Sequence, residues 1–175
     1  MTIITISGLP GTGTTTVALL LKEKTQLPYV YTGDIFRKLA QQHNMTLEAF
    51  GAYAEKHPEI DKQLDAQQLN ILKRDDVILE GRLAGWIAYQ NEIPAVKIML
   101  TADISIRAQR IVKREGGEIE KRAQEIRKRE QSENNRYMNY YNIDASDLSI
   151  YDIIIDTSNL TPDEIVEKIL KVVKI

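Results

Sequence analysis

Short runs of apolar, largely β-branched residues alternate along the chain with longer stretches whose apolar residues recur at helical spacing. The runs cover residues 2–7, 29–31, 77–79, 95–100 and 152–155. Each is almost continuously apolar, which is typical of a strand buried on both faces of a parallel sheet. The pattern therefore predicts an α/β fold, a three-layer αβα domain built on a five-stranded parallel sheet.

The ends of two helices are marked in the sequence. Thr161 is placed to cap a helix that has Pro162 at its first position and Glu164 three residues after the cap. One apolar face of this helix is made of Ile165, Val166, Ile169, Leu170 and Val173. We expect that face to pack on the core. Gly116 and Gly117 are expected to end another helix, which begins near residue 103.

Two segments interrupt the alternation without contributing strands. Residues 35–74 are helical in pattern and lie between the second and third strands, so we expect an inserted helical subdomain. Residues 118–141 are highly charged and poor in apolar side chains, and we expect them to lie partly off the core. The 175 residues suit one domain.

Composition excludes several classes of protein. Lys and Arg (23) nearly balance Asp and Glu (25), and the net charge of −2 gives no general attraction to nucleic acid or to an anionic membrane. With no cysteine and only two histidines, neither a disulfide framework nor a zinc cluster is expected. No apolar run reaches the length of a membrane span, and Met1 leads directly into a strand-like segment without a signal-peptide pattern. We therefore expect a cytoplasmic protein that binds neither nucleic acid nor membranes.

A glycine-rich turn joins the first strand to an apolar helix, which is the setting of a phosphate-binding loop. Glycines allow backbone N–H groups to curl around an anion, and the helix N-terminus adds partial positive charge. The turn and the start of the helix consist of Gly8, Leu9, Pro10, Gly11, Thr12, Gly13, Thr14, Thr15 and Thr16. We expect these residues to hold nucleotide phosphates, with the Thr15 hydroxyl binding Mg²⁺.

The loop departs from the general Walker pattern at one position. Gly8 and Gly13 have its spacing, but Thr14 stands where that pattern has lysine. The charge of the phosphates must then be balanced by Mg²⁺ and by cations from elsewhere in the chain. The alternative is a glycine-rich turn without a ligand, which the flanking strand and helix disfavour.

Charged residues that follow the second and third strands are candidates for this role. Asp34 is placed to cap a helix, and Arg37 lies one turn further on, where it can clamp a phosphate. Glu80 and Arg82 follow the third strand, at the carboxyl edge of the sheet where α/β proteins bind ligands. The alternatives are a helix cap with a solvated arginine for the first pair and a charged loop for the second.

Two stripes of arginine follow the fourth strand. Residues 107, 110 and 114 are spaced three and four apart, and residues 122, 129 and 136 recur every seven positions. Most such stripes are solvated helix faces paired with glutamates, so the stripes alone do not distinguish a phosphate site from a charged surface.

Together these segments resemble the archaeal-type cytidylate kinases, a branch of the nucleoside monophosphate kinases. The likeness covers nearly the whole chain. It rests on the triple threonine that ends the 8–16 loop and on residues 33–37 (GDIFR), 80–86 (EGRLAGW), 140–144 (YYNID) and 148–152 (LSIYD). The loop of that branch also has threonine in place of lysine, so Thr14 agrees with it.

The resemblance implies an adenylate-kinase-like P-loop fold. It implies transfer of the γ-phosphoryl group of ATP to CMP or dCMP in the presence of Mg²⁺. Three parts of the chain are implied: a core (1–34, 75–117 and 143–175), an NMP-binding insertion (about 35–74) and a lid (about 118–142).

The resemblance also implies roles for single residues. The 8–16 loop would hold the ATP phosphates, with Thr15 binding the metal directly and Glu80 binding it through water. The acceptor would be bound by Asp34, Arg37 and Arg82. The residues that close over the transferring group would be Arg110, Arg129 and Arg136.

Two alternatives stay open at this point. The quoted residues do not read a base, so AMP or UMP could be the acceptor. The chain could also be a switch that holds ATP or GTP without phosphorylating a small molecule, but a switch needs no second phosphate site and two sets of arginines are present. We expect a monomer.

Overall fold

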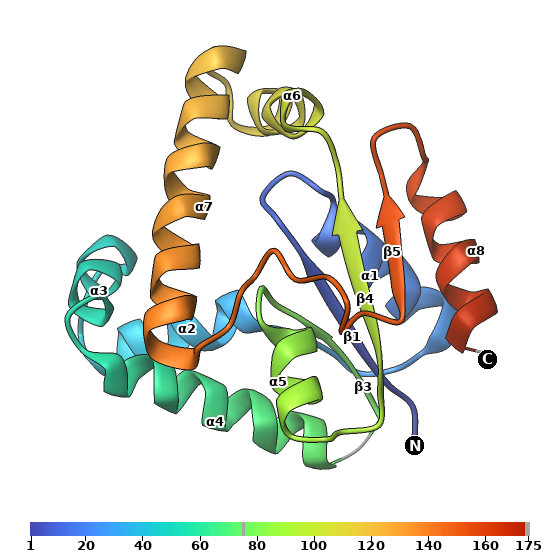
Figure 1. Ribbon diagram of the computed structural model, residues 1–175, viewed down its shortest axis with the longest axis horizontal. Helices are drawn as coiled ribbons and strands as arrows, with labels where there is room; N and C mark the ends of the chain where they lie inside the picture. The colour runs from blue at the N-terminus through green and yellow to red at the C-terminus, as the bar shows by residue number, and fades with distance from the viewer. Residues whose placement is uncertain (75, 174–175) are drawn as a thin grey trace.

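The computed structural model describes residues 1–74 and 76–173, and the side chains of these residues other than 47 and 48. Its strands form one central sheet, and helices follow each strand along the chain (Figure 1). The strands are β1 Ile3–Gly8, β2 Tyr29–Tyr31, β3 Val77–Glu80, β4 Ala95–Thr101 and β5 Ile153–Asp156. The helices are α1 Thr14–Thr25, α2 Thr32–Gln42, α3 Leu47–Ala54, α4 Pro58–Arg74, α5 Ala84–Gln90, α6 Ile104–Glu115, α7 Ile119–Tyr141 and α8 Pro162–Val173. Residues 75, 174 and 175, which the sequence analysis assigned to the core, lie outside the described residues.

All five predicted strands are confirmed, and they form one parallel sheet in the order β2-β3-β1-β4-β5. The central strand is β1, whose Ile3 is paired with Val77 on one side and with Ala95 on the other. From β1 the chain first forms β2 and β3 on one side and then β4 and β5 on the other. The carboxyl end of β1 is therefore the switch point at which α/β proteins bind ligands.

Helices cover both faces of the sheet, as the apolar strands predicted. Because successive residues of a strand point to opposite faces, Ile4 and Ile6 pack with α1 and α8 while Ile3 packs with α5. Trp86 of α5 belongs to the same hydrophobic core as Ile3. Burying each such side chain stabilises the fold by about 2 kcal/mol.

The segment 35–74 is helical, as predicted, and lies beside the sheet. Helices α2, α3 and α4 surround a small core of their own, which contains Leu39, Phe50 and Ile60 (Figure 1). The C-terminal part of α4 joins the hydrophobic core that contains Ile3, through Leu72. The three helices therefore form a unit attached along one side of the molecule.

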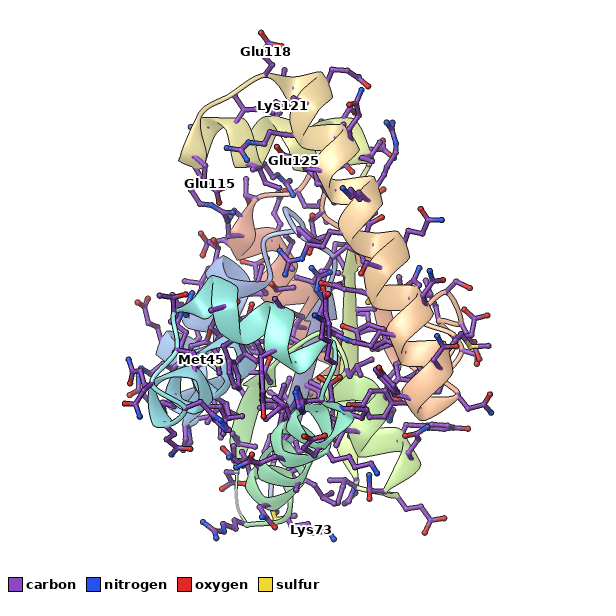
Figure 2. All side chains as sticks on the ribbon, turned by 90° about the vertical axis from the view of Figure 1, so that its left-hand side faces the viewer. Met45, Lys73, Glu115, Glu118, Lys121 and Glu125 are labelled. Carbon is purple, nitrogen blue, oxygen red and sulfur yellow. The ribbon has the colours of Figure 1, made fainter. Side chains whose placement is uncertain are left out.

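The charged segment after residue 117 forms the 23-residue helix α7. Its N-terminal half packs on α6 through Ala123 and Ile126, and near its other end Tyr137 joins the core beneath α5. Figure 2 shows the turn from α6 into α7, with Glu115 and Glu118, projecting away from the rest of the protein. The expectation that this segment lies partly off the core is confirmed.

One helix start was predicted correctly and another was not. In α8 the Thr161 N–H donates to Glu164 Oε2 at 2.8 Å, and the Glu164 N–H donates to Thr161 Oγ1 at 3.3 Å, as the sequence predicted. Asp34 does not cap α2, because the helix begins at Thr32 and Asp34 lies inside its first turn. Gly33, also in this first turn, packs closely on Tyr31: a Cβ on this glycine would lie 2.5 Å from the tyrosine ring.

The helices of the described part of the chain include none that is long and apolar enough to cross a membrane.

Candidate active site

The loop between β1 and α1 leaves the carboxyl end of the central strand and packs on α6. Gly11 and Gly13 have φ angles of 84° and 89°, which glycine adopts without strain. A Cβ on Gly11 would lie 2.8 Å from the backbone oxygen of Arg107, so a larger residue would push the loop off α6. Thr12 closes the turn, since its N–H and hydroxyl donate to Leu9 O at 3.2 and 2.8 Å.

The N-terminus of α1 is open to an anion. Its N-cap residue is Gly13, and no side chain of the described residues caps this end. The N–H groups of the first turn therefore have no partner within the helix, and the helix dipole makes this end attractive to negative charge. This is the backbone geometry expected of a phosphate loop.

A hydroxyl and a buried carboxylate meet beside the loop. Thr15 donates its hydroxyl to Glu80 Oε1 at 2.8 Å, and Tyr29 donates its hydroxyl to Glu80 Oε2 at 2.5 Å. The Glu80 side chain is only 3% exposed, whereas Thr15 is exposed. Burial and the neighbouring carboxylate raise the pKa of Tyr29, so its hydroxyl stays protonated and can serve as a donor. Two sequence-predicted residues are thus brought together from α1 and β3.

These oxygen atoms are of the kind that Mg²⁺ takes as ligands. Residues 1–74 and 76–173 contain no group of three or more His, Cys, Asp or Glu that could hold a metal ion by itself. Mg²⁺ often binds to one or two protein groups, with waters and substrate phosphates completing its octahedron. Thr15 and Glu80 fit a site of that type.

Arg110 lies against the phosphate loop. Its Nη1 donates to Gly11 O at 3.2 Å and to Thr157 Oγ1 at 3.0 Å, and its Nη2 donates to Thr157 O at 2.6 Å. The Thr157 hydroxyl is in turn 2.9 Å from Thr12 O, so the arginine and the end of β5 together brace the loop. A permanent positive charge therefore adjoins a loop in which Thr14 supplies none.

Arg82 and Arg129 converge on one carboxylate. Arg82 Nη1 donates to Gly8 O at 3.2 Å, and its Nε lies 3.4 Å from Glu133 Oε2. Arg129 Nε donates to the other oxygen of Glu133 at 2.9 Å. Burial lowers the pKa of Arg82, and the Glu133 carboxylate opposes this shift. The pairing links α7 to the start of the phosphate loop.

Two other predicted arginines lie away from the loop, one within the helical insertion and one facing it from α7. Arg37 Nη1 donates to Asp34 Oδ1 at 2.7 Å, and both side chains are more than half exposed. Arg136 Nε lies 3.7 Å from Asp61 Oδ2 of α4. Arg37 and Arg136 make no hydrogen bond to the loop among the described residues. The structure thus separates these two from Arg82 and Arg110, which contact the loop.

Several residues of this region were missed by the sequence analysis. Thr157 follows β5 at the same edge as Glu80, so the rule that ligands bind at strand ends could have found it. Glu133 is four residues after Arg129, a spacing that signals a helical ion pair but does not reveal Arg82 as a second partner. Tyr29 and Asp61 carry no such signal, because their roles depend on contacts between distant segments.

The sheet order and the loop that follows its central strand place this chain among the P-loop proteins, which bind nucleotide phosphates in that loop. Residues 3–159 match the cytidylate kinase-like family, and the chain belongs to that family.

Two archaeal relatives show how close the similarity is. The cytidylate kinase of Pyrococcus furiosus is 48% identical over 161 residues, which cover 92% of this chain and 82% of that protein. The cytidylate kinase of Methanocaldococcus jannaschii is 49% identical over 157 residues, with 89% and 88% of the two chains covered.

Solved structures of low sequence identity share the fold. Shikimate kinase from Bacteroides thetaiotaomicron superposes with a TM-score of 0.66 at 14% identity over 99% of both chains. A gluconokinase from Sinorhizobium meliloti superposes with a TM-score of 0.62 at 14% identity, covering 99% of this chain and 91% of that one. The predicted P-loop αβα class is therefore confirmed.

Proposed function

We propose that this protein transfers the γ-phosphoryl group of ATP to CMP or dCMP, giving ADP and CDP or dCDP. The observation that carries the proposal is the contact of Arg82 with the Gly8 carbonyl, because it sets a candidate second phosphate site directly beside the phosphate loop. Relatives of similar length that are named cytidylate kinases support the choice of acceptor.

Residues 8–16 would hold the phosphates of ATP. Thr15, and Glu80 through a water molecule, would hold Mg²⁺, which when bound neutralises charge on the β- and γ-phosphates. Glu80 and Tyr29 would also fix the direction of the Thr15 hydroxyl through their hydrogen bonds. The loop N–H groups and Arg110 would supply the remaining positive field.

The acceptor needs no general base, because its phosphate oxygen is already anionic at neutral pH. Catalysis then consists of holding the two phosphates in line and stabilising charge on the equatorial oxygens. Asp34, Arg37 and Arg82 would position the acceptor, and Arg110 and Arg129 would act on the transferring group. Loss of an arginine that acts in the transition state typically costs about 10³-fold or more in rate.

Water competes with the acceptor for the γ-phosphoryl group. We expect the NMP-binding insertion (about 35–74) and the lid (about 118–142) to close fully only with both substrates bound, which would limit hydrolysis. Release of phosphate from ATP without acceptor should therefore be far slower than full turnover. Equal rates with and without acceptor would contradict this closure.

The direct test is an ADP-release assay with ATP and each of CMP, dCMP, UMP, AMP and GMP at equal concentrations. The proposal predicts kcat/KM values for CMP or dCMP at least about tenfold above those for the other monophosphates. A higher value for AMP or UMP would reassign the acceptor, and ATP binding without transfer to any of them would indicate a switch. We also propose that the enzyme acts as a cytoplasmic monomer, which sedimentation at micromolar concentration would test.

A further inference from the structure

Two buried polar atoms that face each other between α4 and α7 are left without a partner. They are Asp61 Oδ2 and Arg136 Nε, and neither has a hydrogen-bond partner among the described residues. The Asp61 residue is only 7% exposed. Nearly all buried polar atoms in folded proteins are paired. Two unpaired atoms of opposite charge that face each other therefore point to a polar ligand that completes them.

The carboxylate and the guanidinium at this junction do not satisfy each other. Asp61 Oδ2 and Arg136 Nε are 3.7 Å apart, which is too long for a hydrogen bond. An acceptor and a donor at this separation can each bond to one of two neighbouring atoms on the edge of a planar ring. Burial raises the pKa of Asp61 and Arg136 opposes the shift, as expected for a desolvated carboxylate that lacks a bonded donor.

The junction lies at the right place for the base of the acceptor. Arg136 is three residues, close to one helical turn or about 5 Å, beyond Glu133 on α7. Glu133 contacts Arg82, which is the arginine that we assign to the acceptor phosphate. A nucleotide with its phosphate on Arg82 can therefore extend its base along α7 toward α4.

We infer that Asp61 and Arg136 read the base of the acceptor, with Asp61 accepting from the 4-amino group of cytosine and Arg136 donating to the adjacent ring nitrogen. This rests on the proposed function. Arg136 then acts on the base, in place of the role at the transferring group that the sequence predicted.

The arrangement discriminates between the pyrimidines. Cytosine presents an amino donor beside a ring-nitrogen acceptor, whereas uracil presents a carbonyl oxygen beside an N–H. Against uracil, a carboxylate oxygen would face a carbonyl oxygen and the arginine N–H would face another N–H. Sites built to bond a particular polar group reject analogues that lack it, because their own buried groups are left unpaired.

The experiment compares kcat/KM for CMP, UMP and the 5′-monophosphate of the pyrimidin-2-one riboside, which lacks the 4-amino group. In the wild type, removal of the amino group is expected to lower kcat/KM by roughly 10- to 100-fold. In Asp61→Asn, we expect a similar loss for CMP, no loss or a gain for UMP, and an unchanged KM for ATP. The matched control is Glu59→Gln, which removes an exposed negative charge from α4 and should leave the CMP to UMP ratio unchanged.

The outcomes separate the two proposals. If the wild type prefers CMP but accepts the analogue without the amino group equally well, the base-reading role of Asp61 is wrong and the kinase activity stands. The same holds if Asp61→Asn lowers kcat/KM for CMP and UMP by the same factor. If the wild type phosphorylates no pyrimidine monophosphate, the proposed function itself fails. Because the analogue arm uses only wild-type protein, the test does not depend on how well the variant folds.

Discussion

The hydroxyl of Thr15 and the carboxylate of Glu80 are joined by a 2.8 Å hydrogen bond that connects the first turn of α1 to the end of β3. Glu80 is itself fixed by Tyr29 from the edge strand β2. Two strands and one helix therefore converge on a single pair of oxygen atoms beside the phosphate loop. This pair is the proposed metal site, and it can be tested apart from the rest of the loop.

Replacement of Thr15 by Ala should nearly abolish Mg²⁺-dependent turnover, with a loss in kcat of about 10²-fold or more. Thr14→Ala should be milder, because Thr14 occupies the lysine position of the Walker pattern without supplying a charge. Measurement of kcat against Mg²⁺ concentration for both variants checks this prediction. Equal and small effects would contradict the assignment of Thr15 to the metal.

The Arg110→Ala variant should lose about 10³-fold in kcat, because it removes the guanidinium that braces the loop and that we propose acts on the transferring group. It should also lose about 1–3 kcal/mol in the free energy of unfolding, since buried carbonyls lose their donors. Arg110→Lys should recover part of the rate through its charge. Arg114→Ala is the control, because this exposed arginine of the same helix pairs, within the part of the chain that the structure describes, only with Glu115. An Arg110→Ala enzyme with a normal rate would contradict the role.

Much of the fold follows from the sequence because each strand is a near-continuous apolar run. The resemblance to the cytidylate kinases implied that Thr15 and Glu80 bind one metal ion, and the structure brings the two side chains within hydrogen-bond distance. Charged residues on long helices were harder to assign. Arg129 and Arg136 lie on one seven-residue repeat, yet one pairs with Glu133 and the other with Asp61.

That difference depends on how α4 and α7 pack, which local periodicity does not contain. The start of α2 was also missed, because Asp34, which the sequence suggested as a cap, lies inside a helix that begins at Thr32.

Substitution of Glu133 by Gln should make the protein bind its acceptor more tightly. In the ligand-free protein the Glu133 carboxylate forms ion pairs with Arg82 and Arg129. An acceptor phosphate that binds these arginines must therefore displace the carboxylate. We expect KM for CMP to fall about fivefold, the Tm without ligand to fall, and the rise in Tm on adding CMP to increase. Glu125→Gln is the control, because Glu125 pairs with Arg122 near the α6 end of α7 (Figure 2). A raised KM with an unchanged ligand-free Tm would contradict this competition.

The protein should lose stability as pH rises from about 4 to about 6 through the titration of Asp65. Burial raises the pKa of this carboxyl to about 6, with Asp61 adding to the shift while Tyr141 and Arg136 oppose it. Because the unfolded value is about 3.9, the folded state holds more protons between these pH values, so the free energy of unfolding falls with rising pH. Partial exposure to water reduces the effect. Asp65→Asn should therefore be more stable than the wild type by about 1 kcal/mol at pH 7.5 and no more stable at pH 4. Urea unfolding at the two pH values measures this, and a destabilised variant at pH 7.5 would contradict it.

The central claim is that a lysine-free phosphate loop and arginines from separate parts of the chain form two adjoining phosphate sites. Calorimetric titration of an analogue in which adenosine and cytidine are joined by five phosphates tests it most directly, with Mg²⁺ present. Linking two ligands that bind adjoining sites raises affinity by about 10²-fold or more, so the account predicts that the analogue binds at least that much more tightly than ATP, and that Arg82→Ala removes most of the gain. An analogue that binds no more tightly than ATP would contradict the account.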